Sequence, residues 1–290
     1  ARVGEYVVLR KLGEGGMGAV YLAEDPRLGR KVAVKTLKPA LAASRGDCER
    51  FLREARAAAQ LHHDHVMPIL HVGEDARGPY MVMPFLDGEP LDERLRREPV
   101  APPELTLRVG REVCAGLAAA HAKGLIHRDI KPANVWLEGA PAAPELAAQA
   151  RRCRVLDFGL ARAVTAPDAQ LTATGAVMGT PAYMAPEQAR AGAVDHRADL
   201  WSLGVTLYRM TTGRLPFGGD GVTAVLIALA TEAPPPVREL NPAVPPALAG
   251  LIERLLSKDP AARPPSADAV AAELARPEVQ PGANGAWGPV

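Results

Sequence analysis

Short apolar runs, separated by glycine, proline or charged residues, fill about the first eighty positions of the chain. β-Branched and aromatic residues dominate these runs, which is typical of strands. We therefore predict strands at residues 6–9, 19–22, 32–34, 69–72 and 80–83. One helix is predicted among them, from about residue 47 to 61, because Phe51, Ala55 and Ala58 recur on one face with Arg and Glu opposite.

Longer amphipathic stretches replace these runs after Gly88. Their apolar spacing predicts helices over residues 104–122, 199–211, 222–230, 247–256 and 266–274, and Ser266 is a suitable N-cap for the last. The pattern predicts an α+β fold with two lobes: a small antiparallel β-sheet lobe with one helix at residues 1–86, and a larger helical lobe at 87–276. Residues 277–290 are rich in Pro and Gly, so we expect a poorly ordered tail that begins a linker.

Composition narrows the class of protein further. The 34 basic and 33 acidic residues nearly cancel, so no nucleic-acid partner or polybasic membrane arm is expected. The longest apolar run, residues 222–230, falls short of the about 20 residues that a membrane-spanning helix needs, so no span is expected in this chain. Cys48, Cys114 and Cys153 stand far apart and without metal-type spacing, which indicates reduced thiols and a cytoplasmic location.

A glycine-rich segment, residues 13–18, lies between two predicted strands. Glycines let a backbone approach phosphate oxygens and point its amide groups at them. The same pattern occurs in hairpin turns and in dinucleotide sites, although a dinucleotide site should open a helix and here a strand follows. Lysine is scarce in this chain, so Lys35 at the end of the next strand is a candidate phosphate ligand as well as a solvated strand end. Glu54, on the predicted helix, is a candidate partner of Lys35, with Arg53 or Arg56 as its other possible partners.

Two polar segments carry the strongest chemical signal. Residues 127–134, HRDIKPAN, follow a helix and so lie on a loop. Asp129 can accept a hydroxyl proton, Lys131 can neutralise a moving phosphoryl group, and Asn134 offers an oxygen to Mg²⁺. Asp157 of the Asp-Phe-Gly triplet at 157–159 is the second expected metal ligand. Together the two segments predict a phosphoryl-transfer centre.

With these motifs the chain resembles a eukaryotic-type (Hanks-type) serine/threonine protein kinase, and in particular the bacterial receptor-type kinases. The resemblance covers about residues 6–275. It includes the glycine loop, VAVK, the helix glutamate, HRDIKPAN, DFG, the MAPE segment at 184–187, Asp199 and Arg263.

The resemblance implies MgATP as the phosphoryl donor and a role for each motif residue. Lys35 would hold the α- and β-phosphates and be fixed by Glu54. Asp129 would be the catalytic base, assisted by Lys131. Two metal ligands, Asn134 and Asp157, would hold Mg²⁺.

The resemblance also implies the walls of the nucleotide site. Met83 would close the back of the adenine pocket, and backbone groups of Pro84 and Leu86 would bond the adenine edge. Pro84 replaces the acidic residue usual there, but its carbonyl remains available. The phosphates and ribose would be covered by Leu12, Gly13, Gly15, Gly16, Gly18 and Val20, and Arg263 would pair with Glu187.

Acceptor choice and regulation also follow from the resemblance. Lys131 and Thr180 indicate serine or threonine hydroxyls, because tyrosine kinases of the family differ at both positions. Residues 160–177 would form an activation loop, in which Thr172 and Thr174 are the expected autophosphorylation sites. Arg128 would belong to the basic pocket that grips the phosphorylated loop. The alternative interpretation is a loop with incidental threonines.

The expected partners are protein substrates and, through the N-lobe, a second kinase domain. Kinases of this type often continue into a linker and a membrane anchor. Residues 139–152 look inserted between two strands and receive no role. His62, His63 and His65 resemble metal ligands, but the family has a loop rich in His and Pro there, so no metal site is expected.

Two other functional classes share part of the pattern. A catalytically silent pseudokinase, acting as a nucleotide-binding scaffold, should lack the lysine, the base or a metal ligand, and none is missing here. A small-molecule kinase should lack MAPE, Thr180 and the activation loop.

Overall fold

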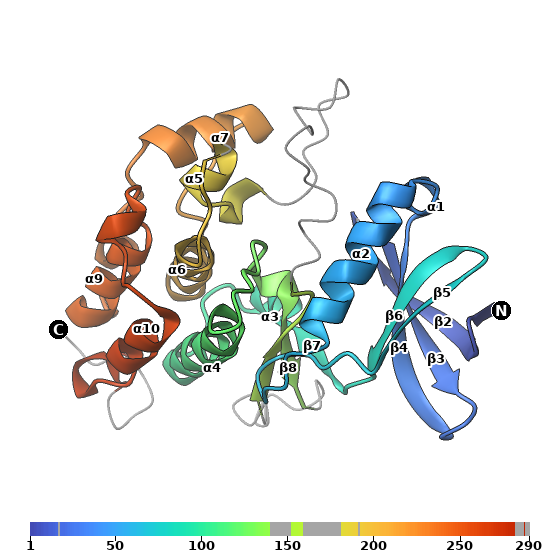
Figure 1. Cartoon of the computed structure of the whole chain (residues 1–290). Coiled ribbons are helices and arrows are strands. Elements are labelled where there is room, and N and C mark those ends of the chain that lie inside the picture. The colour runs from blue at the N-terminus through green and yellow to red at the C-terminus, as the bar shows by residue number, and fades with distance from the viewer. Residues whose placement is uncertain (17, 140–151, 159–180, 191, 282–286, 288–290) are drawn as a thin grey trace.

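The computed structural model describes residues 1–16, 18–139, 152–158, 181–190, 192–281 and 287. Its N-terminal lobe is a six-stranded sheet whose strands pair antiparallel in the order β1-β2-β3-β4-β6-β5 (Figure 1). The strands are β1 (Arg2–Val3), β2 (Tyr6–Glu14), β3 (Gly18–Asp25), β4 (Arg30–Leu37), β5 (His71–Asp75) and β6 (Gly78–Pro84). The five predicted strand segments are thus confirmed, except that residues 69 and 70 precede β5.

Helix α2 (Arg45–Ala58) packs along this sheet, after the short helix α1 (Pro39–Ala42). Ser44 caps α2 by accepting the amide of Asp47. Strand alternation places Val34 in one cluster of buried side chains, whereas Leu37 packs with Phe51 of α2 in the cluster on the other face. Lys35 lies two residues before Leu37 on the same strand, so its side chain also leaves the sheet on the α2 side.

The C-terminal lobe is mainly helical and lies at the other end of the molecule (Figure 1). This lobe also contains a small sheet, made of β7 (Gly88–Pro90), β8 (Val135–Glu138) and β9 (Arg152–Val155). Helix α4 (Pro103–His121) packs against β9, and it also contacts α6 (Arg197–Thr212) and α10 (Ala267–Leu274). The other helices are α3 (Leu91–Arg97), α5 (Pro186–Ala189), α7 (Val222–Thr231), α8 (Val237–Leu240) and α9 (Pro246–Leu255).

The large buried core belongs to this lobe, and α6 contributes most of its length to it, including Trp201 and Tyr208. Ala58, at the end of α2, joins the same core, as do Leu61 and Val66 in the connection from α2 to β5. The connection after α2 therefore anchors the small lobe on the large one. None of the described helices is long and apolar enough to cross a membrane.

Residues 277–281 and 287, the part of the predicted tail that the structure describes, differ from the poorly ordered chain that we predicted. Pro277–Val279 form a 3-10 turn, and Val279 and Trp287 are buried against the large core. Burial of the apolar surface of these two side chains stabilises their packing on the core, a contribution that the Pro/Gly-rich composition does not reveal. Ser266 does cap α10, by accepting the amide of Ala269.

Candidate active site

A cavity of about 760 Å³ opens between the two lobes. The residues that the sequence analysis assigned to nucleotide, metal and catalysis line it together: Leu12, Gly13, Gly15, Gly16, Gly18, Val20, Lys35, Met83, Pro84, Leu86, Asp129, Lys131, Asn134 and Asp157. Of the predicted site residues that the structure describes, Glu54 stands outside this lining, half-buried on α2. Segments up to 145 positions apart (157 − 12) thus converge on one cavity.

Lys35 reaches across the cavity from β4 to the C-terminal lobe. Its Nζ lies 2.7 Å from Asp157 Oδ2, and the two side chains are 9% and 27% exposed. In the sheet Lys35 stands between Val20 of β3 and Met81 of β6, which fixes its backbone from both sides. The pairing of Lys35 with Glu54 stays a prediction.

Asp129 is the centre of a compact polar group. Lys131 Nζ donates to both carboxylate oxygens, at 2.9 and 2.8 Å. Asn134 Nδ2 donates to the Asp129 carbonyl at 2.7 Å and to Oδ2 at 3.0 Å. This arrangement commits the amide nitrogen of Asn134 and leaves its Oδ1 as the atom that can meet a cation.

Asp199, a fully buried carboxylate on α6, holds the backbone that carries Asp129. Its Oδ2 accepts the amide of His127 at 2.9 Å, and its Oδ1 accepts the amide of Arg128 at 2.7 Å. His121 Nε2 donates to the same carboxylate at 2.8 Å. Three donors compensate a charge that burial would otherwise penalise heavily. They also hold Arg128 at φ 67°, a conformation that non-glycine residues rarely adopt.

The imidazole of His127 connects the two polar segments. Its Nδ1 accepts the amide of Asp129 at 3.2 Å, so Nε2 carries the proton that it donates to the Leu156 carbonyl at 2.7 Å. The ring is fully buried and meets Phe158 edge-on, with centroids 4.7 Å apart. Leu156 in turn donates its amide to the Asn134 carbonyl at 2.9 Å. These bonds fix Asp157 (φ 60°) beside Asp129 and Asn134.

The glycine segment forms the end of β2 and the start of β3, as a hairpin closed by the Gly15 amide on the Gly18 carbonyl at 2.8 Å. A side chain at Gly18 would place Cβ 1.7 Å from the Thr36 carbonyl oxygen of β4, whereas Gly13 and Gly15 face open space. Gly18 is therefore required by strand packing. At Gly13 and Gly15 the missing side chains leave room on the cavity.

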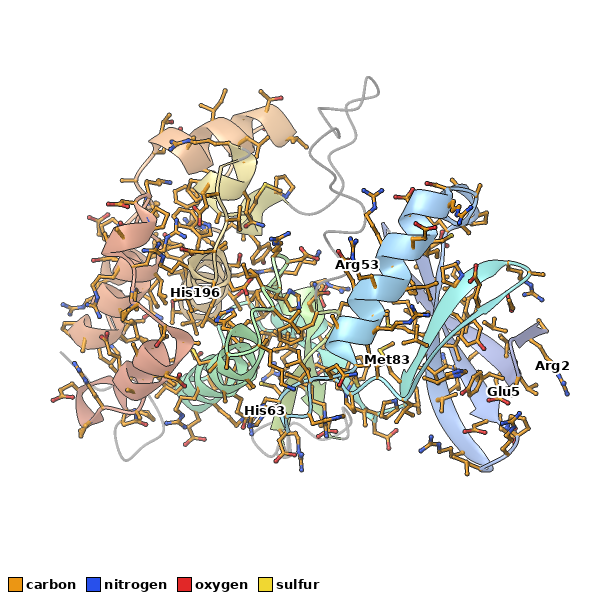
Figure 2. All side chains as sticks on the ribbon, viewed as in Figure 1. Arg2, Glu5, Arg53, His63, Met83 and His196 are labelled. Atoms are coloured by element: carbon orange, nitrogen blue, oxygen red, sulfur yellow. The ribbon has the colours of Figure 1, made fainter. Side chains whose placement is uncertain are left out.

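The far end of the cavity is the connection between the lobes. Met83 is buried in the cluster between the sheet and α2 (Figure 2), at the end of β6. Pro84 pairs with Val32 of β4 and, with Phe85 and Leu86, continues along the cavity. Proline has no amide hydrogen, so Pro84 can offer only its carbonyl to a ligand there.

The segment that begins α5 is fixed under the site by an ion pair. Arg263 donates through Nη1 and Nη2 to Glu187, at 2.6 and 2.8 Å, which confirms the predicted pair. The Arg263 side chain is fully buried. Next to Glu187, Gln188 donates to the Arg128 carbonyl at 3.0 Å, and so ties this segment to the backbone before Asp129.

Sequence reasoning found the residues that face the cavity and missed several that position them. His121 and Gln188 carried no motif signal, and Asp199 entered only through the resemblance, without a role. Other predictions concern residues outside those that the structure describes: Gly159, Thr172, Thr174, Thr180 and the segment 140–151.

The donor set at the end of the cavity suits a hard cation. Asn134 Oδ1 and the Asp157 carboxylate are oxygen donors, and Lys35 and Lys131 add positive charge for an anionic ligand. The arrangement therefore fits a magnesium-bound polyphosphate.

Comparison with known proteins agrees with this arrangement. The protein kinase domain family matches residues 6–274. The chain belongs to the protein kinase family.

Similar proteins in this family include bacterial kinases. The serine/threonine-protein kinase pkn2 of Myxococcus xanthus is 44% identical over 276 residues, 94% of this chain and 32% of that protein. PknA of Mycobacterium tuberculosis is 40% identical over 278 residues, 93% of this chain and 61% of PknA. The chain thus spans only part of the length of these relatives. The crystal structure of the Mycobacterium tuberculosis PknI kinase domain superposes with a TM-score of 0.73 at 29% identity, covering 94% of this chain and 96% of that one.

Proposed function

We propose that this kinase domain transfers the γ-phosphoryl group of MgATP to serine or threonine hydroxyls of proteins. The observation that carries the proposal is the convergence of Lys35, Asp129, Asn134 and Asp157 on one cavity. Bacterial relatives named serine/threonine-protein kinases, about 40% identical over most of the chain, support it.

Each residue of the cavity has a defined task in this reaction. Asp129 accepts the proton of the attacking hydroxyl, and Lys131 on its carboxylate adds positive charge near the transferred group. Lys35 binds the α- and β-phosphates. The metal ion, held by Asn134 and Asp157, supplies charge neutralisation at the phosphates.

The adenine end of the nucleotide lies against the connection between the lobes. Met83 closes the back, the carbonyl of Pro84 and backbone groups of Leu86 meet the adenine edge, and the β2–β3 hairpin covers the phosphates. Leu12 and Val20 cover the ring from the hairpin side.

The acceptor is a serine or threonine hydroxyl because Lys131 and Thr180 match that branch of the family. The test is to incubate the domain with MgATP and a peptide mixture containing Ser, Thr and Tyr acceptors in one sequence context, followed by phosphoamino-acid analysis. Phosphoserine and phosphothreonine are expected. Phosphotyrosine as the main product would contradict the acceptor assignment.

The domain is switched on by autophosphorylation of Thr172 and Thr174. Arg128, on the cavity lining, would receive the phosphate. Phosphosite mapping should find both threonines phosphorylated after incubation with MgATP. Substrate phosphorylation at wild-type rate by a variant with both replaced by alanine would contradict the switch.

Two further aspects extend the proposal beyond the isolated domain. A second copy binds through the N-terminal lobe and favours phosphorylation in trans, which predicts that the specific rate of autophosphorylation rises with protein concentration.

The domain works in the cytoplasm, where ATP is available. Its three cysteines are free and buried, as suits a reducing compartment.

A further inference from the structure

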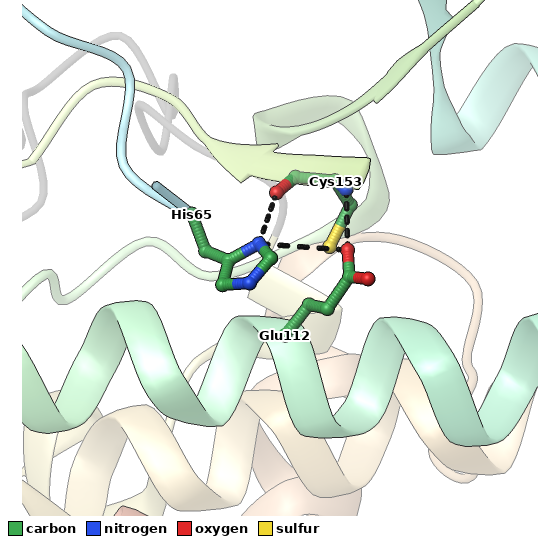
Figure 3. A group of neighbouring side chains, drawn as sticks. All are labelled: His65, Glu112 and Cys153. Atoms are coloured by element: carbon green, nitrogen blue, oxygen red, sulfur yellow. Dashed lines mark hydrogen bonds and ion pairs between the residues drawn. The ribbon is translucent and has the colours of Figure 1, made fainter. Parts of the chain in front are cut away.

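Three side chains with metal-binding atoms meet behind the nucleotide site, on the side of β9 away from the cavity. Figure 3 shows that they come from three separate elements: His65 from the connection after α2, Glu112 from α4 and Cys153 from β9. Their ligand atoms all lie within 4.8 Å of one another. None of the three lines the cavity that holds Asp129 and Asp157.

Backbone contacts hold the three elements in place. The Val155 amide donates to the His65 carbonyl, and the Met67 amide donates to the Val155 carbonyl, both at 2.9 Å. The Cys153 amide donates to Glu112 Oε2 at 2.5 Å, and His65 Nδ1 lies 3.0 Å from the Cys153 carbonyl oxygen. His65 Nδ1 is also 3.5 Å from Glu112 Oε2. The arrangement therefore does not depend on a flexible loop.

We propose that His65, Glu112 and Cys153 form a binding site for one zinc ion, with a water molecule as the fourth ligand. Imidazole, carboxylate and thiolate are the three side-chain ligand types that zinc takes in proteins. Tetrahedral zinc sets neighbouring ligand atoms roughly 3.3–3.8 Å apart, given bonds of about 2.0–2.3 Å. The ligand atoms lie within 4.8 Å of one another, so side-chain rotations that move them by about 1 Å bring them to that geometry.

Charge and burial favour a divalent, borderline-soft ion over Mg²⁺. One thiolate and one carboxylate balance the two charges of zinc, so a neutral unit is buried. Cys153 is almost fully buried, whereas the side chains of His65 and Glu112 are 22% and 18% exposed. The ion and its water can therefore enter from the side of the histidine.

Binding releases one proton. Burial and the neighbouring Glu112 carboxylate raise the pKa of the Cys153 thiol well above its ordinary value, so the metal-free thiol is protonated. Zinc forms a bond to Sγ and the thiol proton leaves to solvent. Nδ1 of His65 gives up its hydrogen bond to the Cys153 carbonyl, and the ring proton moves to Nε2. Nothing is oxidised or reduced.

The position of the site gives the ion a structural consequence. His65 lies in the connection between α2 and β5 of the small lobe, whereas Glu112 and Cys153 belong to the large lobe, so the ion would join the two. Asp157 lies two residues beyond Val155, the residue that pairs with the His65 connection. Zinc should therefore stabilise the base of the segment that presents Asp157.

Cobalt is the direct probe, because Co²⁺ replaces zinc and a thiolate ligand gives a charge-transfer absorption band. The full chain is titrated with Co²⁺ in the presence of excess Mg²⁺ and a non-hydrolysable ATP analogue, which occupy the nucleotide site. One equivalent should produce the band in the wild type. Cys114 is a buried thiol two residues from Glu112 on α4, so the Cys114→Ala variant is the matched control and should keep the band. The Cys153→Ala variant should lose the band.

Glu112→Gln provides the second variant, because it keeps the thiol and an acceptor for the Cys153 amide. The cobalt affinity of this variant should fall at least about tenfold. His62 is an exposed histidine in the same connection, so the His62→Ala variant should bind cobalt as the wild type does. Zinc should raise the melting temperature of the wild type and of Cys114→Ala, but not of Cys153→Ala. Absence of the band at stoichiometric cobalt, its persistence in Cys153→Ala, or unchanged affinity in Glu112→Gln would overturn the proposal. None of these readouts requires phosphate transfer.

Discussion

The ammonium of Lys35 and the carboxylate of Asp157 form an ion pair of 2.7 Å that links the two lobes across the cavity. Lys35 belongs to the sheet of the small lobe, and Asp157 follows β9 of the large lobe. The proposed function gives these two groups separate ligands, the phosphates and the metal ion. Binding of MgATP must therefore rearrange the pair, and each residue then stabilises charge on the nucleotide.

Replacing Lys35 with methionine should remove that stabilisation and leave the fold intact. We expect phosphate transfer to fall by about 10²–10³-fold, the usual effect of losing one group that stabilises transition-state charge. Lys31→Met is the matched control, because Lys31 lies on the same strand with its side chain exposed. Initial rates of phosphate incorporation measure both variants. Comparable rates for Lys35→Met and Lys31→Met would show that Lys35 does not act on the phosphates.

Asp199→Asn should disturb catalysis from outside the cavity. An amide offers one acceptor oxygen, so one of the His127 and Arg128 amides or the His121 donor would lose its partner. We expect a loss of about 1–3 kcal/mol in the free energy of unfolding. Displacement of Asp129 should also lower the rate on the order of a hundredfold. Denaturant titration and initial rates test the two effects, and Asp220→Asn, at an exposed position, should change neither.

Arg263→Ala should be among the most destabilising single changes in the large lobe. It leaves the Glu187 carboxylate, which is only 11% exposed, without its partner, and this should cost about 3–5 kcal/mol in the free energy of unfolding. Arg254 pairs with Glu273 at the surface, so Arg254→Ala should cost less than about 1 kcal/mol. Urea denaturation compares the two. A similar small loss in both would mean that the buried pair contributes little.

Lys258 should make stability depend on pH. Burial lowers its pKa from 10.5 to about 8, although Glu232 opposes the shift. Between these two values the unfolded chain binds more protons at this position than the folded chain does, so the group's contribution to stability rises with pH from about 8 to 10.5. Its Nζ lies 3.7 Å from the Phe217 ring centroid and donates to the Leu229 carbonyl, which holds the charged form in place below that window.

The difference between wild type and Lys258→Met isolates this titration. Relative to the variant, the wild type should gain stability between about pH 7.5 and about pH 9.5. Lys31→Met should follow the wild type. A constant difference between wild type and Lys258→Met across this range would contradict the lowered pKa.

Much of the site could be predicted because its residues are local in sequence. Asp129, Lys131 and Asn134 fall within six positions, and the chemistry of their side chains fits one reaction. The alternation of side chains along β4 also accounts for the side on which Lys35 leaves the sheet. Short-range patterns of this kind are predictive because the local turn or strand fixes the relative positions of the side chains.

The supporting contacts could not be predicted because they join distant positions. Asp199 contacts a backbone amide 72 residues away, and such a contact leaves no periodic signal. The burial of Val279 and Trp287 depends on a surface that exists only once α9 and the large core have formed. The cluster of His65, Glu112 and Cys153 likewise joins three elements whose spacing in sequence shows no metal motif.

The most direct test of the central claim is phosphate incorporation from labelled ATP into the domain and a protein acceptor, compared between wild type, Asp129→Asn and Asp220→Asn. The amide introduced by Asp129→Asn would keep the size of the side chain but could not accept the hydroxyl proton, so the rate should fall by about 10²–10⁴-fold. Asp220→Asn should match the wild type. Equal incorporation by wild type and Asp129→Asn, or none by the wild type with ATP and Mg²⁺ bound, would contradict an active kinase and favour a nucleotide-binding scaffold.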